Sequence, residues 1–311
     1  MSRLAIVTGA NAGIGFQTAL ALAANKYRVI LACRSLARAQ AAATAIRTAH
    51  PSAIVKAMEL DLTAFASVAS FAKAVRREYS SISVLCLNAG IGGMNKHEEP
   101  TGDGQAHEIY RVNFVSHFLL ALLLESTLAA GAPARVVCLS SVMHRSGDAE
   151  WNAPLCSFSP GRRTYASSKL AMAVLAAEIT RRWGAGPQPI VGIAVNPGAV
   201  NSEIWYRGQL AAWLEACAIR PLFAAIFLTS RQGAACSVAA AIEPRFAHPA
   251  PGTYLCPYRT PARCPMPFEL HGPFAGPRLC TPHAAVTDPA AGTALWEATA
   301  KALKEWLQTS G

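Results

Sequence analysis

Short apolar segments alternate with segments of helical periodicity along most of the chain. Apolar runs of strand length lie at residues 4–7, 28–33, 54–59, 83–87, 135–139 and 190–195, and a short run at 253–255 is a candidate edge strand. Helix-period segments lie between them at residues 13–25, 36–49, 64–78, 105–130, 164–183 and 231–242. This alternation predicts an α/β fold, with one doubly wound parallel sheet that carries helices on both faces. Nearly continuous apolar runs such as 135–139 fit strands buried on both faces.

Two segments interrupt the alternation. Residues 201–230 are strongly apolar and helical in pattern. Residues 244–283 are rich in proline and cysteine and are predicted to be loop. Because no linker separates independent units, we expect residues 1–311 to form a single domain.

A closing helix is well marked near the end of the sequence. Asp288 is suited to the N-cap position and Pro289 to the first turn. An apolar stripe follows at helical spacing, formed by Leu295, Trp296, Leu303 and Trp306.

Composition indicates a globular protein of ordinary type. The 311 residues are 52% hydrophobic and 15% charged, without repeats or low-complexity tracts. The net charge of +10 raises the question of nucleic acid as a partner. However, the 28 lysines and arginines are scattered, and no basic run is interleaved with aromatic residues. We therefore expect no binding to nucleic acid.

The cysteines and the first residues bear on the compartment. Three of the nine cysteines, Cys33, Cys86 and Cys138, lie in or beside apolar runs and are expected in the core. An odd count without a secretory signal favours the cytoplasm or another reducing compartment. The cysteines of the segment 244–283 lack a CxxC pair, so no metal site is expected. The chain begins directly with the first strand, and no apolar run approaches about 20 residues, so no targeting or transmembrane segment is expected.

A glycine-rich turn between the first strand and the first helix predicts a dinucleotide site. The segment Thr8–Gly15 reads TGANAGIG. Gly9 permits the turn, Gly13 allows the backbone to approach a pyrophosphate, and Gly15 allows close packing of helix and strand. The N-terminus of the helix then offers N–H groups to the phosphates. The contact residues expected in this turn are Gly9, Asn11, Ala12, Gly13, Ile14 and Gly15.

The end of the second strand indicates which nucleotide is preferred. Sites for NAD usually place Asp or Glu here for the ribose 2′-hydroxyl, whereas this chain has Arg34 and Ser35. These two residues are suited to a 2′-phosphate, so the prediction is NADPH over NADH. The alternative is that Arg34 is only a surface cation. Asp61, followed by Leu62, ends the third strand and is a candidate acceptor for the adenine amino group.

Tyr165 and Lys169 form a candidate proton-transfer pair. They are four residues apart in a helical segment, so they lie on one face of that helix. The ammonium favours phenolate, which lowers the tyrosine pKa from about 10 toward neutrality. An isolated pair of this kind is more often a solvated surface contact, so its weight depends on the surrounding motifs.

Together with Asn88–Ala89–Gly90 after the fourth strand, these motifs resemble those of the short-chain dehydrogenases/reductases. The resemblance runs from residue 4 to roughly residue 255 and implies a single-domain Rossmann fold. It also implies a catalytic tetrad, whose residues in this sequence are Asn113, Ser141, Tyr165 and Lys169. The family's signature near the nicotinamide matches Pro197, Gly198 and Val200, with Ser202 in place of its final threonine.

Finer features resemble the retinol dehydrogenase branch and its protochlorophyllide reductase relatives. These are the TGANAGIG turn, the ACR ending of the second strand, and the NPGAVNSEI and RPLFAAIF segments. The sequence also departs from the pattern. Leu87 stands where many members have a second asparagine, and the membrane anchor common at the start of retinol dehydrogenases is not expected here.

The resemblance implies an NADPH-dependent oxidoreductase that interconverts a lipophilic carbonyl and its alcohol. It also implies that the apolar residues 201–230 form a lid over the substrate. The alternative is that these side chains only pack the segment onto the core. In the implied reaction Tyr165 is the general acid or base, Lys169 lowers its pKa and holds the nicotinamide ribose, and Ser141 stabilises the developing alkoxide. Asn113 anchors a water on the proton route. The alternatives are an NADPH-binding sensor that regulates a partner and, more weakly, a protochlorophyllide reductase-like enzyme. Peripheral contact with a membrane and a homodimer are further expectations that the sequence leaves open.

Overall fold

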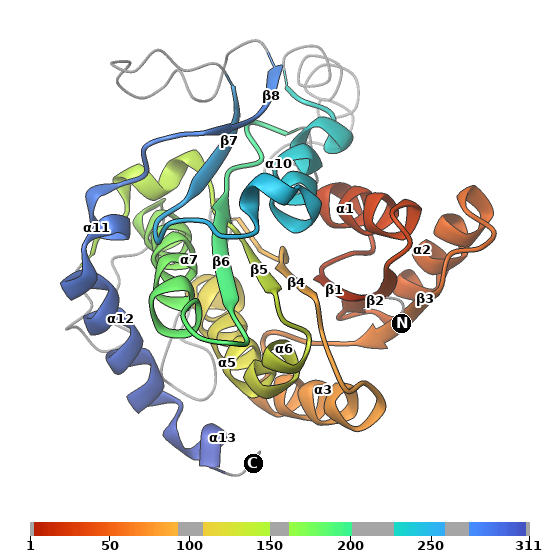
Figure 1. Cartoon of the computed structure of the whole chain (residues 1–311), viewed down its shortest axis with the longest axis horizontal. Helices are drawn as coiled ribbons and strands as arrows, with labels where there is room; N and C mark the ends of the chain where they lie inside the picture. The colour runs from red at the N-terminus through yellow and green to blue at the C-terminus, as the bar shows by residue number, and fades with distance from the viewer. Residues whose placement is uncertain (1–2, 93–107, 150–161, 201–226, 259–273, 309–311) are drawn as a thin grey trace, which may run out of the picture.

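The computed structural model of the chain describes residues 3–92, 108–149, 162–200, 227–258 and 274–308 (Figure 1). Its centre is an eight-stranded sheet with the order β3-β2-β1-β4-β5-β6-β7-β8. The strands are β1 (Leu4–Thr8), β2 (Arg28–Cys33), β3 (Val55–Glu59), β4 (Val84–Leu87), β5 (Ala134–Leu139), β6 (Ile190–Val195), β7 (Tyr254–Tyr258) and β8 (Phe274–Leu279). Neighbouring strands are parallel as far as β7, and β8 is antiparallel to it.

Helices cover both faces of the sheet, as the alternation predicts. Their bounds are α1 (Gly13–Ala24), α2 (Leu36–Ala49), α3 (Phe65–Glu78), α4 (Glu108–Tyr110), α5 (Ser116–Leu123), α6 (Glu125–Ala130), α7 (Arg162–Trp183), α10 (Ser230–Ile242), α11 (Ala284–Thr287), α12 (Pro289–Ala302) and α13 (Lys304–Gln308). One core cluster joins the sheet to α1, α2 and α10, and another joins it to α3, α5, α7 and α12. Figure 1 shows these two groups on opposite sides of the strands. The predicted fold class is confirmed.

The predicted closing helix is also confirmed. The Asp288 side chain accepts a hydrogen bond from the backbone N–H of Ala290, and Pro289 occupies the first turn of α12. Trp296 packs edge-on against Phe118 of α5 and Trp183 of α7, with ring centroids 4.9 and 5.4 Å apart. These contacts hold α12 along the side of α7 (Figure 1).

Within the described residues, the helix predicted over residues 105–130 is interrupted once, at Leu124 between α5 and α6. From Glu108 to Leu123 the chain is helical throughout, because α4, a π-helical turn at Arg111–Val115 and α5 follow one another directly. Asn113 lies in the middle of the π turn, and its amide is hydrogen-bonded to both backbone groups of Ile91. Such turns often mark functional positions in helices. A π turn contains one residue more than an α-helical turn, and the spacing of apolar residues in the sequence does not reveal it.

The segment 244–283 contains strands where the sequence predicted loop. β7 extends beyond the predicted run at 253–255 and is not the edge of the sheet, because β8 pairs with it. The register shifts between Cys256 and Tyr258, where Pro257 has no N–H to donate to the ladder. Each of the two strands contains a proline, Pro257 in β7 and Pro277 in β8, and proline has a low strand propensity that concealed the pair in the sequence. Residues 259–273 lie outside the described part of the chain.

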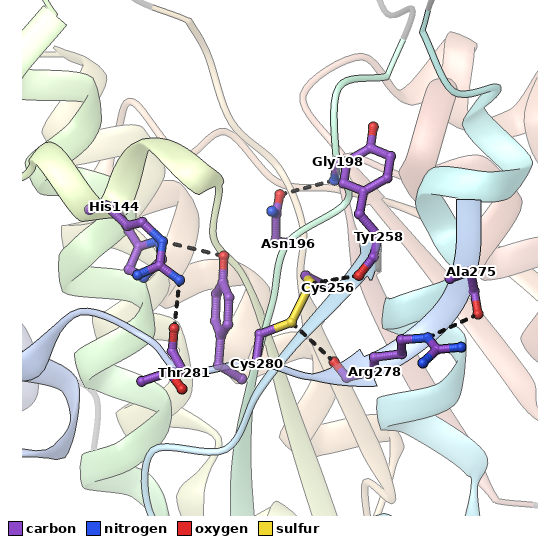
Figure 2. Close-up of a disulfide and its surroundings, with 11 residues drawn as sticks. His144, Asn196, Gly198, Cys256, Tyr258, Ala275, Arg278, Cys280 and Thr281 are labelled. Atoms are coloured by element: carbon purple, nitrogen blue, oxygen red, sulfur yellow. Dashed lines mark hydrogen bonds between the residues drawn. A yellow bond between two sulfur atoms is a disulfide. The ribbon is translucent and has the colours of Figure 1, made fainter. Parts of the chain in front are cut away.

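A disulfide joins Cys256 of β7 to Cys280, just after β8 (Figure 2). Cys33, Cys86 and Cys138 are buried and free, which confirms the prediction that they are core residues. The expectation of reduced cysteines therefore fails for Cys256 and Cys280. The compartment stays a prediction.

No helix in the described ranges is both long and apolar enough to cross a membrane.

Candidate active site

The predicted cofactor and catalytic residues gather at one edge of the sheet. Their segments follow the carboxyl ends of strands β1 to β6, and these strands are parallel, so all of these ends meet at the same edge. The strand order reverses between β1 and β4, which are hydrogen-bonded neighbours. In open α/β sheets, such a reversal opens a crevice in which ligands bind.

The glycine turn after β1 is held against the end of β2. The N–H of Gly9 donates to the carbonyl of Ala32 over 2.8 Å. The Cys33 thiol accepts hydrogen bonds from the backbone of Ala10 and Asn11, and burial raises its pKa to about 11. Cys33 is therefore a neutral core group, and its hydrogen bonds hold the turn in place.

Gly13 and Gly15 are required for different reasons. Gly13 has a φ of 57°, in the left-handed region, and a Cβ there would meet no described atom within 4 Å. A Cβ on Gly15 would lie 2.4 Å from both the Gly9 carbonyl oxygen and Nδ2 of Asn88. Gly15 thus permits close packing inside the protein, whereas Gly13 borders open space before the N-terminus of α1. Ala12, the N-cap, provides no side-chain acceptor for that helix end.

A hydrogen-bond network around Thr8 fixes the turn after β4. Its hydroxyl oxygen accepts from the N–H groups of Asn88 and Ala89, both over 2.9 Å, and Nδ2 of Asn88 donates to the Thr8 carbonyl. Oδ1 of Asn88 is buried without a hydrogen-bond partner among the described residues. A buried acceptor of this kind is expected to find a donor, so it fits a nucleotide held against the turn. Gly90 lies beside Lys169 and Asn113, and a Cβ there would lie 3.3 Å from Nζ and 3.2 Å from Oδ1.

Arg34 and Ser35 occupy the end of β2 as the sequence predicted. Arg34 is exposed, and the Ser35 hydroxyl caps α2 by accepting from the N–H of Arg38. Arg38 is exposed one turn further on. It is a second candidate for a 2′-phosphate that the sequence reasoning missed, and its place in the first turn of α2, directly after Arg34 and Ser35, was a usable signal.

Asp61 lies at the end of β3, and its side chain has a local partner. Oδ1 accepts from both the N–H and the hydroxyl of Thr63, over 2.9 and 2.8 Å, which shapes the turn before α3. Leu62 is buried in the core. The contact of Asp61 with adenine stays a prediction.

Lys169 is buried beneath the site. Only 3% of the residue is exposed, and Nζ donates to the carbonyl oxygen of Leu139 over 3.1 Å. Burial lowers the pKa of Lys169 to about 8. The ammonium is 5.7 Å from the centre of the Tyr165 ring. Because Lys169 is buried, the pair is not a solvated surface contact, and that alternative interpretation is wrong.

Tyr165 is hydrogen-bonded to Ser141. Burial raises the pKa of Tyr165 above its usual value, and the hydrogen bond with Ser141 acts in the opposite direction. The sequence predicted a lowered pKa caused by Lys169. The structure differs because loss of solvent around the phenol outweighs every other influence on it.

Ser141 combines two roles that the sequence presented as alternatives. Its Oγ accepts the N–H of Met143 over 3.2 Å and so caps the 3₁₀ turn η2 (Val142–Ser146). Accepting from the backbone leaves the hydroxyl hydrogen free to donate elsewhere. The cap therefore orients the hydroxyl and leaves its hydrogen available for a second hydrogen bond.

Asn113 is fully buried and its amide is engaged with protein groups. Oδ1 accepts from the N–H of Ile91 over 2.8 Å, and Nδ2 lies 3.1 Å from both the Ile91 carbonyl and Oγ of Ser168. Its own carbonyl oxygen is 3.0 Å from Nδ1 of His117. The side chain thus ties the turn after β4 to α7 beside the tyrosine and lysine.

The segment after β6 is braced from the C-terminal part of the sheet. Gly198 has a φ of 79°, and Oδ1 of Asn196 accepts its N–H over 2.9 Å (Figure 2). The Tyr258 hydroxyl accepts the N–H of Ala199 over 3.0 Å. Asn196 and Tyr258 are site-shaping residues that the sequence reasoning missed.

Two of the predicted elements are described only in part. Val200 is buried and forms an isolated bridge to Leu228. Ser202 lies outside the described residues, as does most of the lid predicted at 201–230.

This arrangement agrees with comparisons against known proteins. A family whose members are described as short chain dehydrogenases matches residues 3–209. The chain belongs to the short-chain dehydrogenase/reductase family.

Curated relatives of the chain include retinol dehydrogenases. It is 39% identical to dehydrogenase/reductase SDR family member 13 of Bos taurus, over 78% of this chain and 64% of that one. It is 34% identical to retinol dehydrogenase 12 of Homo sapiens, over 78% of this chain and 75% of that one. The chain thus spans less than two thirds of the length of the first of these relatives.

Solved structures share the fold. An uncharacterised protein from Mycobacterium paratuberculosis is 27% identical with a TM-score of 0.70, over 97% of this chain and 93% of that one. An NADPH-bound short-chain oxidoreductase from Pseudomonas aeruginosa PAO1 is 23% identical with a TM-score of 0.63, over 81% of this chain and 93% of that one.

Two buried histidines beside the site are expected to make the stability of the protein sensitive to acid. Burial lowers the pKa of both His117 and His144 from 6.5 to about 4, and the charges of Lys169 near His117 and of Arg145 and His283 near His144 act in the same direction. Between these values the unfolded chain binds more protons than the folded one. The free energy of unfolding is therefore expected to fall as pH drops from about 6.5 to about 4, by up to about 3 kcal/mol per histidine.

Urea titrations at a series of pH values test this expectation. The full contribution is present above pH 6.5 and is lost as the pH falls below it. A His144→Phe variant cannot be protonated at that position, so its acid slope should be shallower. An unchanged slope in this variant would mean that His144 takes up no proton on unfolding.

Proposed function

We propose that the protein is an NADPH-dependent oxidoreductase that interconverts a lipophilic carbonyl and its alcohol. The observation that carries the proposal is the Tyr165–Ser141 hydrogen bond beside the buried Lys169, at the edge where the glycine turn opens α1. A phenol, a hydroxyl and a buried ammonium together supply a proton, a second donor and a positive charge. The relationship to retinol dehydrogenases supports the same class of reaction.

In the reductive direction, Tyr165 donates its proton to the carbonyl oxygen of the substrate. The raised pKa of Tyr165 keeps the phenol protonated at neutral pH, as this role requires. Ser141 donates its hydroxyl hydrogen to the same oxygen as negative charge develops there. Bound NADPH supplies the hydride.

Lys169 and Asn113 support these two groups. With a pKa of about 8, Lys169 remains largely cationic at neutral pH and stabilises negative charge at the phenol when the proton leaves. It is also the residue proposed to hold the nicotinamide ribose. Asn113 keeps Gly90 and the turn around Ile91 beside this ammonium.

The preference for NADPH is proposed from the cations after β2. Replacing Arg34 by Asp removes a charge-assisted partner of the 2′-phosphate and adds repulsion, so the Kd for NADPH should rise about 10- to 100-fold. The Kd for NADH should stay the same or fall, because NADH lacks that phosphate and the new carboxylate can accept from its ribose 2′-hydroxyl. Fluorescence titration with both nucleotides measures this.

The control for this substitution is Lys73→Asp, which makes the same change of charge at an exposed position on α3, on the other face of the sheet. It should leave both Kd values near those of the wild type. Equal binding of NADH and NADPH by the wild type would contradict the proposed preference.

The substrate class is proposed from the apolar composition of residues 201–230, which include Trp205, Trp213 and Phe223. Such a segment suits retinal, a steroid ketone, a fatty aldehyde or an isoprenoid. NADPH oxidation at 340 nm across a panel of these compounds and of small aldehydes tests the proposal. Turnover of apolar members supports it, and turnover of small aldehydes alone contradicts the apolar class. Tight NADPH binding without turnover would favour the sensor.

A further inference from the structure

His144 lies three residues after Ser141 and is fully buried. It belongs to the 3₁₀ turn η2 that Ser141 caps. The proposed chemistry does not use the imidazole. A buried histidine in this place therefore requires a physical account of its own.

Both ring nitrogens of His144 have backbone partners. Nδ1 lies 2.7 Å from the carbonyl oxygen of Ser141, and Nε2 lies 3.1 Å from the backbone nitrogen of His283. The N–H of His283 must donate, so Nε2 accepts and carries no hydrogen. The neutral ring then carries its hydrogen on Nδ1 and donates it to Ser141. The ring thus bridges Ser141 to His283, which lies 139 positions after His144.

Tyr254 of β7 holds the other side of the imidazole. The two rings are 4.7 Å apart between centroids, and the Tyr254 hydroxyl is 3.4 Å from Nδ1. This contact restricts the rotation of the His144 ring about its side-chain bonds. The hydrogen on Nδ1 therefore stays directed at Ser141.

The segment that carries His283 is itself anchored. It follows β8 and the disulfide between Cys280 and Cys256, and Nη2 of Arg145 donates to the carbonyl oxygen of Thr281 over 2.6 Å. Figure 2 shows His144 and Thr281 on one side of the disulfide. This part of the chain lies beyond residues 3–209, which match the family.

We infer that His144 is a positioning residue for Ser141, and that the C-terminal segment at His283 is the anchor that holds it in place. The inference rests on the proposed role of Ser141 as the second donor to the substrate oxygen. Fixing the Ser141 carbonyl sets the direction of its hydroxyl, which caps Met143 and meets Tyr165. The C-terminal segment thereby takes part in the geometry of the proposed site without touching substrate.

Two pairs of variants separate this role from general stability. His144→Phe keeps a ring against Tyr254 and removes both hydrogen bonds, whereas His144→Asn keeps a donor near the Nδ1 position. His283 has a φ of −60°, which suits proline, so His283→Pro removes the N–H without imposing a new backbone angle. Because His283→Pro also removes the side-chain cap on Ala285, His283→Ala is its matched control.

The expected result is a loss of kcat with little change in KM for NADPH. His144→Phe and His283→Pro should lower kcat about 10- to 100-fold, since small displacements of a catalytic donor have effects of this size. His144→Asn should recover part of the loss, and His283→Ala should retain the kcat of the wild type. In a Ser141→Ala background, His144→Phe should lower kcat less than about twofold further, because it acts through Ser141. Wild-type kcat in His144→Phe and His283→Pro would overturn the inference.

Hydrogen exchange gives a readout that does not need turnover. The amides of residues 141–147 should exchange faster in His283→Pro than in His283→Ala. Equal protection in these two variants would overturn the inference even if the wild type turns over no carbonyl. If the wild type turned over no carbonyl but the two variants showed the expected difference in exchange, only the proposed function would be contradicted.

Discussion

Replacing Tyr165 by Phe is expected to lower kcat for carbonyl reduction by about 10²- to 10⁴-fold, the range that general acid catalysis contributes. The substitution keeps the ring that packs near Lys169 and removes only the hydroxyl that meets Ser141. The Kd for NADPH should therefore stay within about threefold of the wild-type value. Steady-state turnover and fluorescence titration measure the two quantities.

The control is Tyr27→Phe, which deletes a hydroxyl from a buried tyrosine that packs against Arg3. It should leave kcat unchanged. If Tyr165→Phe retained more than about a tenth of the wild-type kcat, the proton would have to come from another group.

The pH dependence of the wild type follows from the same two groups. The raised pKa of Tyr165 keeps the acid in place through neutral pH, so the rate of reduction should be level there. It should decline as the pH rises through about 8, where Lys169 loses its charge. A decline that began well below that pH would contradict this assignment.

Replacing Gly13 by Ala is expected to separate cofactor binding from stability. An alanine at a φ of 57° costs about 1–2 kcal/mol, and its methyl group would meet no described atom within 4 Å. The methyl group would, however, occupy the space before the N-terminus of α1 that is proposed for the pyrophosphate. The Kd for NADPH should therefore rise about 100-fold or more while the apoprotein stays folded.

Two further glycine variants serve as comparisons. Gly276→Ala imposes similar strain, at a φ of 77° on β8 with no described atom within 4 Å, and should leave NADPH binding unchanged. Gly15→Ala should lower both affinity and stability, because its Cβ would lie 2.4 Å from the Gly9 carbonyl oxygen. Urea denaturation without nucleotide and titration with NADPH distinguish the three. If Gly13→Ala bound NADPH with the affinity of the wild type, the proposal that the pyrophosphate lies at this turn would be wrong.

Some features of the fold were determined by short-range patterns in the sequence. Apolar runs and helical periods placed the strands β1 to β6 and the helices α1, α2, α3 and α10 to within one or two residues. Asp288 and Pro289 marked the start of α12 correctly. These features depend on backbone geometry and side-chain spacing within a few residues, so they can be recognised in a segment without knowledge of the rest of the chain.

The same logic placed the candidate site. Each motif follows a strand of the parallel sheet, and the carboxyl ends of such strands meet at one edge whatever the details of packing. The sequence alone therefore sufficed to bring the glycine turn, Asn88, Ser141 and the Tyr165 helix together. It also identified the family.

The tertiary structure decided what depends on contacts between distant residues. The pairing of β8 with β7, the disulfide between Cys256 and Cys280, and the hydrogen bond from His283 to His144 have no local signature. The pKa of Tyr165 moves opposite to the sequence expectation, because burial depends on every segment packed around the phenol. Spacing along a helix fixes which side chains are neighbours, but the loss of water around them is set only when the whole chain has folded.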